Sequence, residues 1–141
     1  MPLKLSLKPG ETFVLNGAVI QNGDRRNVLV LQNQASVLRE RDIMQPADAN
    51  TPARRVYFPL MMMYLDASET LSYAAQFNQR LAEFTASVEN FAMRGECLSI
   101  SKLVVEGHIY KALMLCRRLI ESEDEVIDHQ DQAAQTRAAT H

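Results

Sequence analysis

The first part of the chain carries basic side chains at a spacing that could bind phosphate groups. Lys4, Ser6 and Lys8 alternate with leucines, so on a β-strand they would share one face. Arg39 and Arg41 would share a face of a second strand in the same way. Arginine can hold a phosphate through two parallel hydrogen bonds and can stack on an unpaired base. The spacing therefore makes single-stranded nucleic acid one candidate ligand.

This interpretation requires the first and fifth predicted strands to lie side by side, so that their cations form one ridge. Arg25 and Arg26 would stand at the tip of a predicted hairpin, and we include them among the candidate RNA contacts. The alternative is structural, because charged side chains on an edge strand also prevent strand-to-strand aggregation. The residues alone leave both interpretations open.

The net charge of the whole chain conceals this basic region. Its 141 residues include 15 basic and 17 acidic ones, a net charge of −2, which argues against a polyanion-binding protein. Residues 1–56, however, carry eight basic and five acidic groups, a local charge of +3, and the remainder carries −5. The sequence therefore predicts that RNA contacts lie in the first 45 residues and protein contacts in the rest.

Residues 1–45 have the turn pattern of a small antiparallel β module. We predict strands over residues 3–8, 12–15, 18–21, 27–32 and 35–42. Asn16-Gly17 is a strong two-residue hairpin signal, because both residue types tolerate a positive φ, and Asn22-Gly23 repeats it. Short strands with such turns suggest a small barrel or sandwich.

The rest of the chain has mainly helical spacing. Residues 46–65 are predicted to be a linker, in which Thr51 and Pro52 could start a helix, although the segment could equally be extended. An antiparallel helical region is predicted over residues 66–128, with helices over 66–95, 97–106 and 108–127. Residues 129–141 lack large apolar groups and are predicted to form a flexible tail. The predicted fold class is α+β.

Signatures of catalysis and of metal binding are absent from the sequence. There is no phosphate-binding loop, dinucleotide fingerprint, nucleophile elbow or zinc-protease motif. Cys97 and Cys116 form no CxxC pair and the three histidines are scattered, so we predict no metal and no cofactor. We expect a protein that is not an enzyme. No apolar run approaches the ~20 residues of a membrane span, so we expect a cytoplasmic protein with no membrane partner.

Two further patterns bear on protein partners. The run Met61-Met62-Met63 is more typical of an adaptable core, but methionine-rich surfaces also bind variable partners. Acidic residues cluster between positions 121 and 131, which is typical of a solvated helix face. The cluster could also shield the basic region or contact a basic partner.

Several separated segments resemble the FlbT family of flagellar biosynthesis regulators. They are LKLSLKPGETFVLNG, QNGDRRNVLVLQNQASVLRERDIM, TPARRVYF with MMMYLD, and GHIYKALMLCRRLIESEDEVI, in this order. The resemblance extends to about residue 128. It implies a small cytoplasmic bacterial protein that represses flagellin synthesis after transcription. Such a protein binds the 5′ untranslated leader of flagellin mRNA and couples filament synthesis to flagellar assembly. The family includes reported activators, so the resemblance leaves the sign of regulation open.

The first 45 residues also resemble the carbon-storage regulator CsrA, an RNA-binding protein that forms strand-swapped homodimers. The shared features are the L-x-L strand, the Gly10-Glu11-Thr12 turn and the later V-x-R-E segment. The resemblance places RNA contacts on Leu5, Ser6, Lys8 and Arg39, and it allows a homodimer. This chain departs from the CsrA pattern at Leu7 and Leu38, where the relatives have arginine and histidine.

A second hypothesis belongs to a different class of function. The chain could be a protein-binding adaptor or chaperone-like factor in the flagellin pathway, acting on the mRNA only indirectly. Its partner would then be flagellin or another flagellar regulatory protein. The apolar residues at helical spacing in residues 66–95, the methionine run and the acidic cluster suit partner helices better than nucleic acid.

Overall fold

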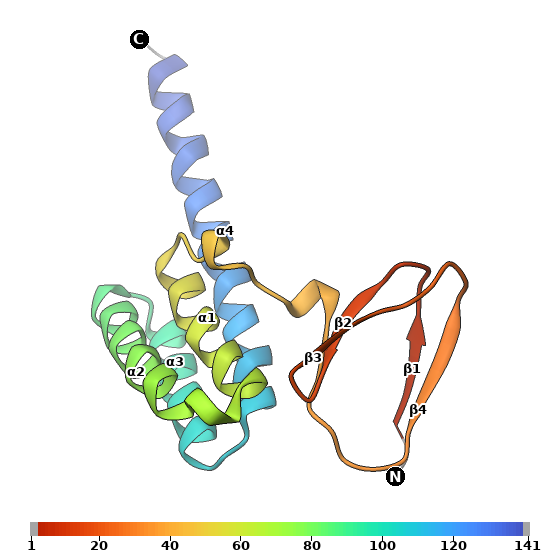
Figure 1. The fold of residues 1–141 in the computed structure, drawn as a ribbon. Coiled ribbons are helices and arrows are strands. Elements are labelled where there is room, and N and C mark those ends of the chain that lie inside the picture. The colour runs from red at the N-terminus through yellow and green to blue at the C-terminus, as the bar shows by residue number, and fades with distance from the viewer. Residues whose placement is uncertain (1–2, 140–141) are drawn as a thin grey trace.

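In the described part of the chain, five short strands come first and four α-helices follow them (Figure 1). This computed structural model describes the backbone of residues 3–139 and the side chains of residues 3–128 except Ala67. The described strands are β1 (Leu3–Leu7), β2 (Thr12–Leu15), β3 (Ala18–Gln21), β4 (Asn27–Leu31) and β5 (Val37–Arg39). The described α-helices are α1 (Pro52–Leu65), α2 (Thr70–Ser87), α3 (Phe91–Val105) and α4 (Ile109–Ala139). The predicted α+β class, with the antiparallel strands ahead of the helices, is confirmed.

The strands form two small antiparallel sheets, and their order differs from the expected one. β1 pairs with β4, in a register that places Leu5 opposite Leu29, while β2 lies between β3 and β5. The first and fifth strands therefore do not pair. Leu5, Leu7 and Phe13 face inward and form the small core of the β module.

One of the two predicted hairpin turns forms and the other does not. Asn16 and Gly17 have φ values of +48° and +83°, as a tight β2–β3 hairpin requires. Asn22-Gly23 instead begins a connection between the two sheets, because β3 pairs with β2 and β4 pairs with β1. The Asn22 side-chain amide donates to the carbonyls of Lys8 at 2.8 Å and Arg25 at 2.9 Å.

The fifth strand is shorter than predicted, which separates two candidate site residues. β5 ends at Arg39, and the next three residues, Glu40–Asp42, form the short 3₁₀ helix η1. The Asp42 side chain is buried and forms an ion pair with Arg117 of α4. Arg41 therefore lies on η1 and does not share a strand face with Arg39.

Residues 52–65, for which the sequence allowed either a helix or an extended chain, form the helix α1. The Thr51 hydroxyl accepts a hydrogen bond from the Arg54 N–H and caps α1, and Pro52 occupies the first turn. Pro59 lies inside the helix and is buried. Met61 and Met63 are also buried, so the methionine run is core, as its more frequent role suggested.

The helix predicted to continue to Gly95 is interrupted earlier. α2 ends at Ser87 and α3 begins at Phe91, because the Asn90 side chain accepts from the Met93 N–H as an N-cap. Gly95 lies within α3. The apolar spacing continues across this break, which is why spacing alone joined the two helices.

α4 packs against α1 and α3 and then continues beyond them (Figure 1). Ala112, Leu113, Cys116 and Leu119 are completely buried, as expected for the predicted antiparallel pair with α3. The helix runs to Ala139, past its predicted end near Ile127. The side chains of residues 129–139 and all of 140–141, where a flexible tail was predicted, lie outside the described residues.

The β module and the helices are joined by core packing and by polar contacts. Leu38 of β5 is completely buried and belongs to the same core as the helices. The Tyr64 hydroxyl of α1 donates to the Val37 carbonyl and accepts from the Val37 N–H, both at 2.9 Å. The Tyr57 hydroxyl donates to the Asp42 carbonyl at 2.5 Å. These contacts fix β5 and η1 against α1.

Part of the predicted acidic face turns inward. Glu123 is buried, and its Oε2 accepts a hydrogen bond of 2.8 Å from the Ala53 N–H at the start of α1. Asp124 receives two hydrogen bonds from the Arg54 guanidinium, at 2.9 and 2.8 Å. Two members of the cluster therefore stabilise the N-terminus of α1, where negative charge is favoured.

Candidate nucleic-acid interface

An ion pair between Glu11 and Arg39 lies at the centre of the candidate site. The Arg39 guanidinium donates to both carboxylate oxygens of Glu11, with its shortest contact at 2.8 Å, and to the Ser6 carbonyl at 2.5 Å. β1 and β5 thus meet through one side chain and not through a strand ladder. The Lys8 N–H donates to the Glu11 carboxylate at 3.0 Å. Glu11 therefore ties the β1–β2 turn to the end of β5.

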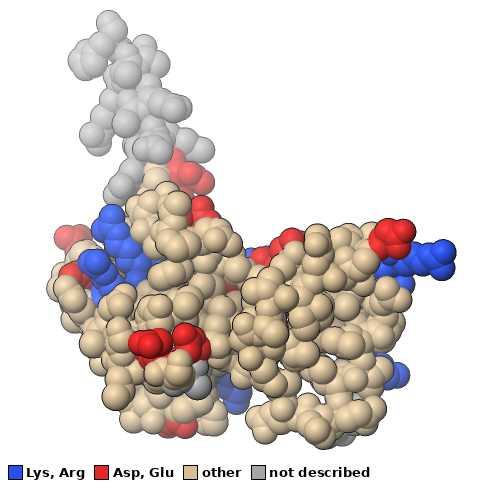
Figure 2. Space-filling model, in the orientation of Figure 1, with Lys and Arg blue, Asp and Glu red and all other residues tan. Residues whose placement is uncertain are grey.

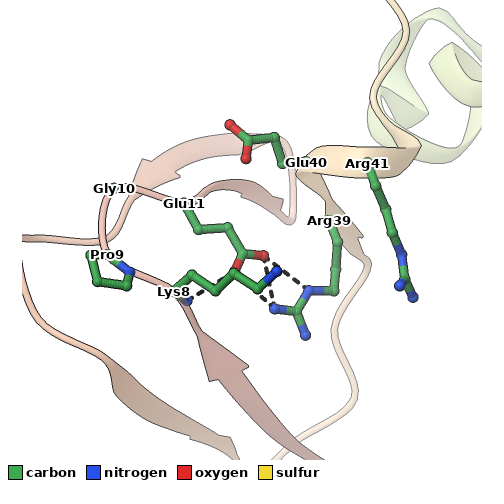
Figure 3. Close-up of a pocket in the computed structure, with 7 residues that line it drawn as sticks. All are labelled: Lys8, Pro9, Gly10, Glu11, Arg39, Glu40 and Arg41. Atoms are coloured by element: carbon green, nitrogen blue, oxygen red, sulfur yellow. Dashed lines mark hydrogen bonds and ion pairs between the residues drawn. The ribbon is translucent and has the colours of Figure 1, made fainter.

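The pocket around this pair has a volume of about 370 Å³ and is lined by three basic and two acidic residues (Figure 3). The lining residues are Lys8, Pro9, Gly10, Glu11, Arg39, Glu40 and Arg41. In Figure 3 the Lys8 side chain extends toward Arg39, Arg41 extends beside it, and Glu40 points away from them. Lys8 and Arg41 are exposed. Glu11 neutralises Arg39, and the exposed Arg41 guanidinium lies 4.0 Å from the buried Asp42 carboxylate, so Lys8 and the outer part of Arg41 supply the positive charge that faces solvent.

The Glu11 carboxylate is held in its charged form. The Lys8 backbone N–H and the Arg39 guanidinium lower the pKa of this carboxyl below its ordinary value. At neutral pH the pair therefore holds the Arg39 guanidinium in one position. Two of its donors are already used, which limits the bidentate phosphate contact that the sequence suggested for Arg39.

The candidate residues on β1 divide between the two faces of the strand. Lys4 and Ser6 are exposed on one face, as the alternation predicted, and Lys8 follows the strand into the pocket. Leu5 is only 8% exposed and belongs to the small core, so its side chain is not free to bind RNA from the exposed face. The exposed face is completed by Val28 and Val30 of β4.

Arg25 and Arg26 lie in the connection between β3 and β4, and both are exposed. Asn22 holds this connection next to Lys8, since its amide reaches both the Lys8 and Arg25 carbonyls. Figure 2 shows basic side chains at the outer end of the β module, beside an acidic group. The predicted ridge is therefore a discontinuous set of cations around the β1–β2 turn.

Sequence reasoning treated Glu11 only as part of a turn. Its three-residue spacing from Lys8 is compatible with a side chain that accepts from the backbone of that turn. Its pairing with Arg39 bridges 28 positions and has no local signal. The part that Tyr64 plays in holding β5 was also missed, because it depends on how α1 packs against the β module.

Fold and site together define a small α+β protein with a basic pocket beside a β-turn and a helical region fixed behind it. Comparison with protein-family models matches residues 3–127 to the family described as flagellar protein FlbT. The chain belongs to the FlbT family.

Curated relatives agree with this assignment over most of the chain. A protein of Caulobacter vibrioides named flagellum biosynthesis repressor protein FlbT is 62% identical over 129 residues, which cover 92% of each chain. A Rhodopseudomonas palustris protein named probable flagellum biosynthesis repressor protein FlbT is 35% identical over 127 residues, covering 90% of this chain and 98% of its own. No solved structure matches the chain, and the likeness to CsrA stays a prediction.

Proposed function

We propose that this chain is a cytoplasmic, non-enzymatic repressor of flagellin synthesis that binds the 5′ untranslated leader of flagellin mRNA. The repressor role is supported by the names of its relatives, and the leader RNA is the ligand that the family resemblance implies. In the described part of the chain, no helix is both long and apolar enough to cross a membrane. Binding of the leader would couple flagellin translation to flagellar assembly.

The observation that carries this proposal is the cluster of exposed cations around the β1–β2 turn. Lys8 and Arg41 line one pocket, and Arg25 and Arg26 are held next to Lys8 by Asn22. The outward face of β1 adds Lys4 and Ser6. Exposed lysine and arginine side chains dominate the affinity of proteins for phosphate backbones. Because Arg39 is paired with Glu11, its role in this proposal is to position the turn.

The test is fluorescence anisotropy of a labelled flagellin leader with the purified chain at several salt concentrations. The double variant K8A/R41A should weaken binding and flatten the slope of log K against log salt by about 1.4, since each single-strand phosphate contact contributes about 0.7. A matched control is R80A/R94A, which also removes two exposed basic side chains, from α2 and α3. Equal affinity and slope for K8A/R41A and the wild type would overturn the site assignment.

A second candidate function, a protein-binding adaptor, is favoured by one surface of α3. Phe91, Leu98 and Val105 are seven residues apart, so they share one helix face, and they are 90%, 71% and 85% exposed. Large apolar side chains grouped on one face are typical of protein contacts. Capture of purified flagellin after nuclease treatment, lost in F91S/L98S, would support the adaptor. Failure of the same protein to bind leader RNA would exclude the first proposal.

A further inference from the structure

A second, larger groove lies where the β module meets the helices. Its volume is about 940 Å³, and it is lined by residues of β1, the β4–β5 loop, β5, the end of α1 and the start of α4. The side chains used below are Arg39, Tyr64, His108, Tyr110 and Lys111. Tyr110 and Lys111 belong to the first turn of α4, far in sequence from the predicted RNA-binding strands.

The charge of this groove differs from that of the chain as a whole. Its lining includes Lys111 and His108, which are exposed, and Arg39, whose charge Glu11 balances. None of its lining residues is acidic, although the chain carries a net charge of −2. Asn16, Gln34 and Ser36 add uncharged polar side chains. Such a lining suits an anionic ligand with hydrogen-bonding edges.

Two aromatic rings provide a fixed surface for a planar group. The ring centroids of Tyr64 and Tyr110 are 5.7 Å apart, with planes inclined by 45°. Tyr64 cannot turn freely, because its hydroxyl bonds to both the N–H and the carbonyl of Val37. Its ring therefore supports the ring of Tyr110, which is 45% exposed. Unpaired bases stack on partly exposed, well-held rings of this kind.

The groove adjoins the basic pocket, because Arg39 lines both. A single strand whose phosphates lie at Lys8 and Arg41 could thus continue past Arg39 to α4. We propose that this groove binds an unpaired base of the same RNA, stacked on Tyr110, with a neighbouring phosphate at Lys111. The proposal rests on the proposed RNA function, and it extends the RNA surface beyond the first 45 residues to the helical part.

Three variants of the full chain test the stacking contact and the charge contact separately. One base stacked on an aromatic ring is worth about 1–3 kcal/mol, so Y110A should weaken leader binding by about 5- to 150-fold without changing the salt slope. Y110F should bind like the wild type, because it keeps the ring. K111A should flatten the salt slope by about 0.7. Circular dichroism melting curves of each variant verify that the fold is retained.

Leu71 provides the control, since it is a large exposed side chain on a different helix. L71A should bind RNA like the wild type. Crosslinking with a 4-thiouridine-containing leader, followed by mass spectrometry, should yield a peptide that contains Tyr110. Y110A that binds as tightly as L71A, or crosslinks confined to residues 3–41, would overturn the groove assignment.

The outcomes separate this inference from the proposed function. If the wild-type chain binds the leader and the Y110A substitution leaves that binding unchanged, the groove assignment alone is overturned. If the chain does not bind the leader but binds an unstructured oligouridine, and Y110A weakens that binding, the leader proposal is overturned and the groove assignment stands. Binding of neither RNA overturns both.

Discussion

Replacing Glu11 by glutamine should make the chain less stable and, at the same time, a more salt-dependent RNA binder. The carboxylate accepts from the Lys8 N–H at 3.0 Å and from the Arg39 guanidinium at 2.8 Å, and it is 8% exposed. Hydrogen bonds to charged groups contribute about 1.5–3 kcal/mol each, against about 1 kcal/mol for neutral ones. Glutamine keeps one acceptor oxygen, so we expect E11Q to lower the free energy of unfolding by about 1–3 kcal/mol.

The assay is urea unfolding followed by circular dichroism at several pH values. The pKa of Glu11 is lowered in the folded chain from its ordinary value of 4.5, so the pair's stabilisation is complete above the unfolded value. It is lost as the pH falls through the lower, folded value. Glutamine does not titrate, so the difference between wild type and E11Q should be largest at neutral pH and shrink in acid.

The control is E40Q, which removes the same charge from an exposed residue of the same pocket. A surface change of this kind should alter stability by no more than about 0.5 kcal/mol. In the RNA assay, E11Q frees Arg39 for one more phosphate, which would steepen the salt slope by about 0.7. Equal stability of E11Q and E40Q at pH 7, or a difference that does not change with pH, would refute the reasoning.

Three further variants or measurements test other contacts of the described chain. D42N should lower the free energy of unfolding in urea by about 2–4 kcal/mol, because it leaves the Arg117 guanidinium without its anionic partner; a loss below 0.5 kcal/mol would contradict this. G17A should cost about 1–2 kcal/mol in the same assay, since φ is +83° and a Cβ would lie 3.2 Å from the Leu65 carbonyl. Burial raises the pKa of the Cys116 thiol, so a disulfide reagent should label it only after unfolding, and rapid labelling of the native chain would show that the thiol is accessible.

The local features of the fold could be predicted because they depend on neighbours in the sequence. The alternation on β1, the Asn16-Gly17 turn and the Thr51 cap of α1 each rest on residues within a few positions of one another. Asn90, which caps the start of α3, is such a local signal too. The sequence nevertheless predicted one helix over residues 66–95, because the apolar spacing continues across the break between α2 and α3.

The features that the sequence did not predict depend on contacts between distant residues. The Asp42–Arg117 pair spans 75 positions and holds a buried carboxylate just after β5, while the contact of Glu123 with Ala53 spans 70 and turns an acidic side chain inward. From the order of charges in the sequence alone, each of these acidic side chains could pair with many different basic or N–H groups. Only the packing of α4 against α1 selects one, so a count of charges along the sequence cannot tell a paired cation from a free one.

The uneven distribution of charge over the fold explains how a chain with net negative charge can present a positive surface. The ion pairs Asp42–Arg117, Glu11–Arg39 and Asp124–Arg54 each join one negative and one positive group, so together they add nothing to the net charge of the surface. Lys4, Lys8, Arg25, Arg26 and Arg41 are exposed on the β module, against exposed Asp24 and Glu40. Tyr57 and Tyr64 fix β5 and η1 to α1, which sets the position of the pocket relative to the groove at α4. An RNA strand that bound both would therefore meet two sites at a fixed spacing, and the entropy of bringing them together would already be spent in folding.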